Sequence, residues 1–166
     1  MKQVCIGLFG TCGGSKWRDA FMAAYAERGI NFFNPQVEDW TPECAEIEAE
    51  HLVNDDVILF PVTNETFGTG SLAETGFSIM QALKSNTNRS VVIMIDPKVN
   101  DALQIADATT AKESARARAL VRAHLKKVQH PGVYIVEDLD TMLNVSIDLY
   151  DIHSRLNRLQ ASLKPV

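Results

Sequence analysis

The residue with the clearest chemical potential is Glu74, which follows a loop with two glycines at residues 66–70. Such small residues let the main chain approach a ligand closely. An apolar run at 57–62 precedes the loop, and residues 71–83 have helical spacing. We therefore expect Glu74 in the first turn of a helix, where the helix dipole keeps a carboxylate ionised, as a nucleophile or base must be. The alternative is that Glu74 only stabilises the helix start.

A second carboxylate could come from the preceding helix, expected at about 42–53, which carries Glu43, Glu46, Glu48 and Glu50. Most of this acidic run should face solvent, but one carboxylate near the carboxyl end of the helix could point toward Glu74. Two carboxylates at one sugar suit glycosidic chemistry, because one can attack or stabilise the anomeric carbon while the other handles protons.

The most glycine-dense stretch, residues 10–15, follows an apolar run at 4–9. It lacks the Gly-Lys-Ser/Thr of a phosphate loop and the Gly-x-Gly-x-x-Gly of a dinucleotide site. What remains is a set of small residues and main-chain N–H groups at a helix start, able to take a phosphate or a sugar hydroxyl. Lys16 and Arg18 could contact the same ligand or be solvated. The candidate substrate-binding residues here are Gly10, Thr11, Gly13, Gly14, Ser15, Lys16 and Arg18.

The remaining reactive side chains show no site pattern. Three cysteines, at 5, 12 and 44, include no CxxC pair, and no histidines have ligand spacing. We therefore expect no disulfide framework, no zinc or other metal site, no cofactor, and a reducing, cytoplasmic location. All four histidines are expected to be structural or surface residues.

Charge and hydropathy exclude two classes of partner. The net charge of −5 and the pI near 5.3 would repel a polyanion, so we expect no nucleic-acid partner. No apolar run approaches membrane-spanning length and the N-terminus has no leader pattern, so we expect no membrane partner. A solvated face is expected for the basic residues between 110 and 128, which are Lys112, Arg116, Arg118, Arg122, Lys126 and Lys127.

The order of elements indicates an α/β fold. Apolar runs predict strands at 4–9, 30–33, 57–62, 90–95 and 133–136, and helices should follow each of them. Residues 96–109 have no clear period and are expected to form a long loop or a short irregular helix. We predict one domain over 1–166: a flavodoxin-like, doubly wound parallel five-stranded sheet of order 2-1-3-4-5. In that order the loops after the first and third strands meet at the switch point and would line one pocket.

A long C-terminal helix is predicted from about Asp138 or Asp140. Its apolar residues alternate spacings of three and four over three heptads, at Met142, Val145, Leu149, Ile152, Leu156, Leu159 and Leu163. This seam could pack on another subunit or on the sheet of the same chain, and both possibilities stay open.

Several motifs in order resemble the nucleoside 2-deoxyribosyltransferase superfamily, which includes nucleoside 5′-monophosphate N-glycosidases. They are the glycine turn, Trp17-Arg18, Asn34-Pro35, the helix with Glu48, Asp55-Asp56-Val57-Ile58-Leu59 and Gly70-Ser71-Leu72-Ala73-Glu74-Thr75-Gly76. The resemblance covers about residues 4–95. It implies that Glu74 is the nucleophile and Glu48 its acidic partner, and it adds Asn34, Gly68, Gly70 and Ser71 to the candidate substrate-binding residues. Two positions differ: Gly68 replaces an aspartate that holds the base, and Leu8 and Phe9 stand where a tyrosine orients the nucleophile.

The expected function is cleavage or transfer at the N-glycosidic bond of a (2′-deoxy)nucleoside or nucleotide. The resemblance also implies a homo-oligomer, because family members often complete a site with a neighbour's residues. One alternative is a phosphoribohydrolase of the lysine-decarboxylase-like Rossmann family, whose glycine loop resembles residues 67–74. Another is a nucleotide-sensing module without turnover.

Overall fold

The sheet has the predicted strands and strand order. The computed structural model describes residues 3–39, 41–85 and 88–163. All strand pairs are parallel and the order is β2-β1-β3-β4-β5. The strands are β1 (Ile6–Leu8), β2 (Phe32–Phe33), β3 (Val57–Val62), β4 (Ser90–Ile95) and β5 (Val133–Val136). β1 is shorter than its apolar run: it pairs with β3 at three positions and with β2, at the edge, at two.

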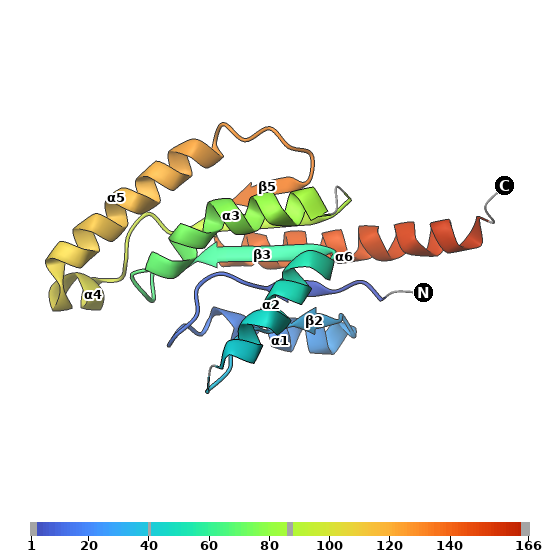
Figure 1. Cartoon of the computed structure of the whole chain (residues 1–166), viewed down its shortest axis with the longest axis horizontal. Helices are drawn as coiled ribbons and strands as arrows, with labels where there is room; N and C mark the ends of the chain where they lie inside the picture. The colour runs from blue at the N-terminus through green and yellow to red at the C-terminus, as the bar shows by residue number, and fades with distance from the viewer. Residues whose placement is uncertain (1–2, 40, 86–87, 164–166) are drawn as a thin grey trace.

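Helices cover both faces of this sheet (Figure 1). One core cluster joins the sheet to α1 (Trp17–Arg28) and α6 (Leu139–Ser162) through side chains such as Phe21 and Met142. The other joins it to α2 (Pro42–Asn54), α3 (Thr69–Ser85) and α5 (Ala108–Leu125). The residues of β3 are buried along its whole length, as its continuous apolar run predicts for a central strand.

The segment 96–109 contains the short helix α4 (Asp101–Ala106), which is one of the two predicted alternatives. The capping-box spacing of Thr110 and Glu113 predicts a helix start at Thr110, but α5 begins at Ala108. Asp107 caps α5, because its carboxylate accepts hydrogen bonds from the main chain and the hydroxyl of Thr110. An Asp cap therefore replaces the predicted capping box.

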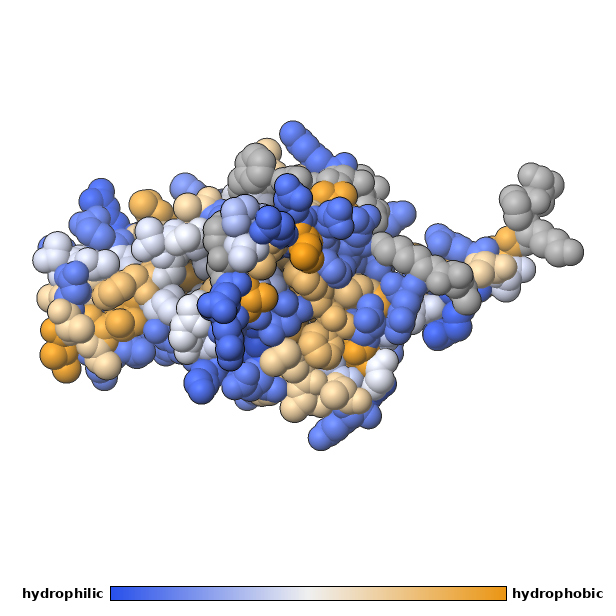
Figure 2. Space-filling view, turned by 60° about the horizontal axis from the view of Figure 1, so that its bottom comes forward, coloured by the Kyte–Doolittle hydropathy of each residue, from blue (hydrophilic) through white to orange (hydrophobic). Residues whose placement is uncertain are grey.

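The apolar seam of α6 is divided between two environments. Met142 and Leu149 are buried against the sheet, while Ile152, Leu159 and Leu163 are more than half exposed. The C-terminal part of the helix extends past the sheet (Figure 1), and it projects from the body of the molecule at the right of Figure 2. None of the helices in the described ranges combines the length and the apolar character needed to cross a bilayer.

Candidate functional site

The loop after β1 packs directly on the end of β3. Gly10 has a φ of 89°, and a Cβ there would lie 2.3 Å from the carbonyl oxygen of Pro61. The Thr11 main chain donates to that same carbonyl over 2.9 Å, and the Thr11 hydroxyl accepts a 2.9 Å hydrogen bond from the N–H of Thr63. Thr11 is 1% exposed. It therefore joins the two loops at the switch point, and its side chain does not line the cleft described below.

Arg18, in α1, binds the main chain of the same loop. Its guanidinium donates to the carbonyls of Leu8 (2.9 Å) and Thr11 (2.6 Å), lies 4.5 Å from the centre of the Trp17 ring, and is 1% exposed. The sequence left two roles open for Arg18, a solvated side chain or a ligand contact, and this burial fits neither of them. Arg18 instead organises the loop through its main chain.

Arg118 performs the equivalent task for the loop after β3. It donates 3.0–3.1 Å hydrogen bonds to the carbonyls of Val62, Thr63 and Thr66, and it is fully buried. The solvated face predicted for this residue is therefore wrong, because the loop carbonyls need a donor and α5 supplies it. Gly68 has a φ of 67° next to this guanidinium, where a Cβ would lie 2.8 Å from Arg118 Nη2.

The start of α1 already holds a carboxylate of the chain itself. Glu65 accepts hydrogen bonds from the hydroxyl of Ser15 and from the main chain of Lys16 (2.9 Å). Burial raises the pKa of Glu65, but the bonds from Ser15, Lys16 and Thr63 outweigh it and hold the pKa below its usual value. The main-chain N–H groups at this helix start were predicted to be able to bind a phosphate, but the N–H of Lys16 already donates to Glu65. Ser15 is not the helix cap; that position is Lys16.

The loop after β1, the segment after β2, α2 and the start of α3 enclose a cleft of about 400 Å³. We call it the carboxylate cleft because Glu48 of α2 and Glu74 of α3 both line it. Its lining residues are Gly10, Cys12, Gly13, Pro35, Gln36, Val37, Glu48, Gly70, Ser71 and Glu74. A hollow of about 540 Å³, the side hollow, adjoins it and shares Gly13, Gln36 and Val37. The other residues of the side hollow are Gly14, Ser15, Lys16, Asp19, Met22, Asn34 and Glu38.

The environment of Glu74 differs from the sequence expectation. Because α3 begins at Thr69, Glu74 lies in the second turn and not in the first, where the dipole effect is strongest. Burial in the cleft raises the pKa of Glu74, although part of its side chain stays exposed. The effect of burial on the pKa is therefore opposite to the one expected from the helix dipole.

Glu48 is affected by three influences. Burial raises its pKa most, the negative charge of Glu74 raises it further, and the positive charge of Arg18 lowers it. Mutual repulsion belongs to the pair, and it acts on whichever carboxyl ionises second. The cleft therefore holds two interacting carboxyls, each with a pKa raised above its usual value.

The predicted site residues fall into three groups. Gly10, Glu48, Gly70, Ser71 and Glu74 line the carboxylate cleft with Gly13. Gly14, Ser15, Lys16 and Asn34 line the side hollow, again with Gly13. Thr11, Arg18 and Gly68 line neither and hold the loops in place. Whether the lining residues bind a substrate stays a prediction.

Gln36 is a residue that the sequence analysis missed. Its amide donates to the carbonyl of Gly13 (2.8 Å), and its amide oxygen accepts a 3.3 Å hydrogen bond from Arg18. It lines both the cleft and the side hollow. Gln36 directly follows Asn34-Pro35, which come after the carboxyl end of β2. Because ligands bind beyond the carboxyl ends of parallel strands, this position could have indicated Gln36 as a candidate site residue.

A third hollow of about 490 Å³ lies beyond the ends of β3, β4 and β5, and several carboxylates line it. These acids already have structural partners. Asp138 caps α6, Asp96 accepts a 2.7 Å hydrogen bond from the main chain of Asn64, and Glu137 pairs with Arg122. The arrangement is explained by the fold alone.

Comparison with known proteins adds information on the fold. No family model and no curated protein sequence matches the chain. Among solved structures, the chain is similar to the crystal structure of the RPS4 and RRS1 TIR domain heterodimer. The TM-score is 0.55 at 8% sequence identity, over 90% of this chain and 99% of that one. This likeness supports the flavodoxin-like α/β architecture and carries no statement about activity.

Proposed function

We propose that this chain cleaves or transfers the N-glycosidic bond of a (2′-deoxy)nucleoside, with Glu74 as nucleophile and Glu48 as general acid. One observation carries the proposal: two carboxyls with raised pKa, from different helices, line one cleft beside the glycine turn. Groups with perturbed pKa in a cleft are typical of catalytic sites. The motif resemblance independently assigns these same two residues.

The proposed chemistry requires an ionised Glu74 and a protonated Glu48. The ionised Glu74 attacks C1′ of the sugar and forms a glycosyl ester, while the bond from C1′ to the base nitrogen breaks and its electron pair leaves with the base. The Glu48 carboxyl gives its proton to the departing base. Water or a second base then attacks C1′, Glu74 is released, and Glu48 takes up the proton that the incoming group loses.

The side hollow favours a neutral 5′ end on the substrate. Lys16 is its single cation, whereas Asp19 and Glu38 contribute two negative charges. The N–H of Lys16 at the start of α1 donates to Glu65 and so is not available to a phosphate. A 5′-hydroxyl can bond to the exposed loop here, but a 5′-phosphate would meet net negative charge. These charges support a nucleoside rather than a 5′-monophosphate as the substrate, and they argue against a phosphoribohydrolase.

The exposed half of the α6 seam supports a homo-oligomer. Ile152, Leu156, Leu159 and Leu163 leave 40–64% of their surface exposed on a helix that extends past the sheet. Heptad seams of this kind pair with a second copy of the same helix. Two chains joined through α6 would bury these side chains.

Base release and base exchange test the proposal. The protein is incubated with deoxynucleosides, their 5′-monophosphates and ribonucleotides, each with and without a second free base, and the bases are separated by chromatography. Exchange identifies a transferase and release alone a hydrolase. We expect activity on the nucleoside that exceeds activity on its 5′-monophosphate.

Glu74→Ala should reduce the turnover by at least about 100-fold, since the nucleophile is lost. Glu46→Gln, an exposed glutamate of α2, is the matched control and should retain wild-type turnover. Unchanged activity in Glu74→Ala would overturn the assignment of the nucleophile. Binding of nucleosides without release or exchange would identify a sensing module instead.

A further inference from the structure

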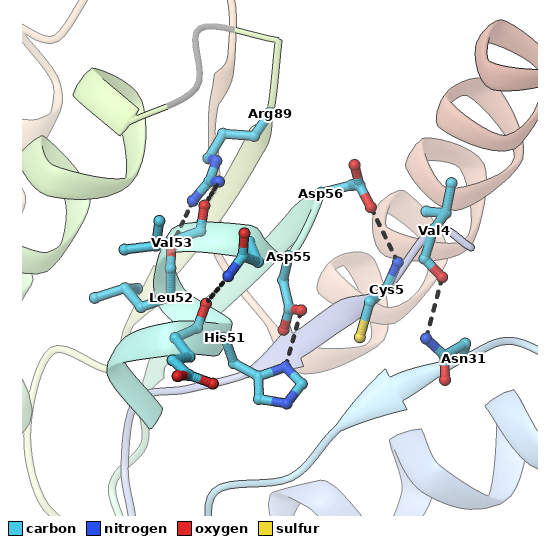
Figure 3. Close-up of polar contacts among 11 residues, drawn as sticks. Val4, Cys5, Asn31, His51, Leu52, Val53, Asp55, Asp56 and Arg89 are labelled. Carbon is cyan, nitrogen blue, oxygen red and sulfur yellow. Dashed lines mark hydrogen bonds and ion pairs between the residues drawn. The ribbon is translucent and has the colours of Figure 1, made fainter. Parts of the chain in front are cut away.

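The opposite edge of the sheet holds a second cluster of reactive side chains. Cys5 precedes β1, His51 lies in the last turn of α2, and Asp55 caps the end of that helix before β3. The Cys5 sulfur, a ring nitrogen of His51 and a carboxylate oxygen of Asp55 all lie within 4.8 Å of one another. In Figure 3 the sulfur of Cys5 and the carboxylate of Asp55 are both directed toward the imidazole ring. We propose that these three side chains bind a Zn²⁺ ion.

The geometry is close to that of a zinc site. In a tetrahedral site, bonds of roughly 2.0–2.3 Å place neighbouring ligand atoms about 3.3–3.6 Å apart. His51 Nδ1 and Asp55 Oδ1 are 3.0 Å apart. A shift of well under 1 Å would open this pair to the tetrahedral spacing. The Cys5 sulfur lies within 4.8 Å of its two partner atoms, so it would need to approach them by about 1 Å.

The ligand types select the metal. A thiolate and an imidazole favour Zn²⁺ over Mg²⁺ and Ca²⁺, which prefer oxygen ligands. A thiolate and a carboxylate together neutralise a divalent cation. His51 leaves 35% of its side chain exposed while Asp55 leaves 4%. The ion would thus enter past the imidazole, and a water could complete its coordination from that side.

The surrounding structure holds the ligands in place before any ion binds. The His51 ring is stacked on Phe33, with 3.6 Å between centroids and 2° between planes. The main chain of Cys5 donates to Asp56 over 3.2 Å, and Arg89 donates to the carbonyls of Leu52 and Val53 in the last turn of α2 (Figure 3). Such supporting contacts orient metal ligands and strengthen binding.

Gly7 is part of the same arrangement. A Cβ at this position would lie 2.7 Å from Asp55 Oδ2. The absence of a side chain therefore leaves the space that the carboxylate occupies next to β1. The zinc site would join β1, α2 and β3, which are distant in the sequence, and α2 carries Glu48 one turn before His51. The sequence pattern excluded zinc because none of these ligands has motif spacing; only the fold brings them together.

Zinc binding to the untagged full-length chain tests this proposal. Competition with a colorimetric chelator measures affinity and stoichiometry, and Co²⁺ substitution reports a thiolate ligand through its near-ultraviolet charge-transfer band. We expect one Zn²⁺ per chain and that band in the Co²⁺ form. Cys5→Ala should weaken zinc binding by at least about 100-fold and abolish the band.

Matched controls are Cys44→Ala, a cysteine of the same helix α2 as His51, and His124→Gln, an exposed histidine of α5. Both should bind zinc as the wild type does. Thermal unfolding with and without Zn²⁺ should show a rise in Tm for the wild type and for both controls, and none for Cys5→Ala or His51→Gln. Equal zinc affinity in the wild type and Cys5→Ala, or loss of binding in Cys44→Ala, would overturn the proposal. Base release plays no part in these measurements, so their outcome is independent of the glycosidic function.

Discussion

Arg18 and Arg118 lie on opposite faces of the sheet and hold the two loops at its switch point by the same means. Each is buried, and each donates to several main-chain carbonyls of one loop. Arg18 of α1 holds the loop after β1, and Arg118 of α5 holds the loop after β3. Burial lowers the pKa of both guanidinium groups without removing their charge. Both loops are thus held by buried arginines, neither of which lines the carboxylate cleft.

Replacement of Arg118 should destabilise the protein strongly. In Arg118→Met the carbonyls of Thr63, Thr66 and Asp96 lose the Arg118 donor, and each buried unsatisfied group costs about 1–3 kcal/mol. The carbonyl of Val62 keeps the hydrogen bond from the N–H of Asp96. We expect the free energy of unfolding to fall by about 3 kcal/mol or more in urea denaturation. Arg116→Met, an exposed arginine of the same helix, should change it by less than about 0.5 kcal/mol. Similar losses of unfolding free energy in the two variants would contradict this role of Arg118.

Alanine at the glycines of the first loop should give graded effects. Gly10→Ala combines a positive φ with a Cβ that meets Pro61, so we expect a loss of about 3 kcal/mol or more. Gly13 has a φ of 71° but open space around it, so only about 1 kcal/mol should be lost. Gly14 has neither constraint, and Gly14→Ala should be neutral or slightly stabilising. Chemical denaturation of the three variants measures this order, and a neutral Gly10→Ala would disprove the close approach to β3.

The raised pKa of Glu48 has a consequence for stability at different pH values. A carboxyl with a raised pKa in the folded state favours folding below its usual value of 4.5, and this contribution is lost as the pH rises through the folded pKa. Glu48→Gln should therefore raise the Tm at pH 7, and the gain should vanish below about pH 4. Glu46→Gln on the same helix should show no comparable gain. A Tm for Glu48→Gln that stays below the wild-type value at neutral pH would show that the surroundings of Glu48 do not disfavour its ionised form.

Disruption of the exposed α6 seam should dissociate the oligomer. Two charges introduced by Ile152→Glu and Leu159→Glu would face each other across the interface, so light scattering should give the mass of one chain, where the wild type gives a multiple of it. Ile105→Glu changes an apolar residue of α4 that is 86% exposed and should keep the wild-type mass. A monomeric wild type would contradict the proposed assembly.

Much of the architecture could be predicted because it depends on local patterns. The runs at β3 and β4 are continuous and apolar, and strands buried on both faces need no polar alternation, so their place at the centre of the sheet was correct. The start of α6 was predicted at Asp138 or Asp140, and Asp138 is the cap, since its carboxylate accepts a 2.6 Å hydrogen bond from the N–H of Thr141. The alternation of strands and helices indicated a doubly wound parallel sheet, and the predicted order 2-1-3-4-5 is confirmed.

Other features depend on contacts between distant segments, which no local pattern encodes. The composition of α5 predicts a solvated face, yet Arg118 is buried because the loop after β3 presents unpaired carbonyls to it. Glu65, an ordinary loop residue in the sequence, occupies the start of α1 only after the fold brings it there. The sequence by itself determined the sheet and the candidate glutamates. The tertiary structure decided which charges meet. Burial and proximity in the fold raise the pKa of Glu48, and burial raises that of Glu74. The fold also brings Cys5 to His51 and Asp55, which are distant from it in the sequence.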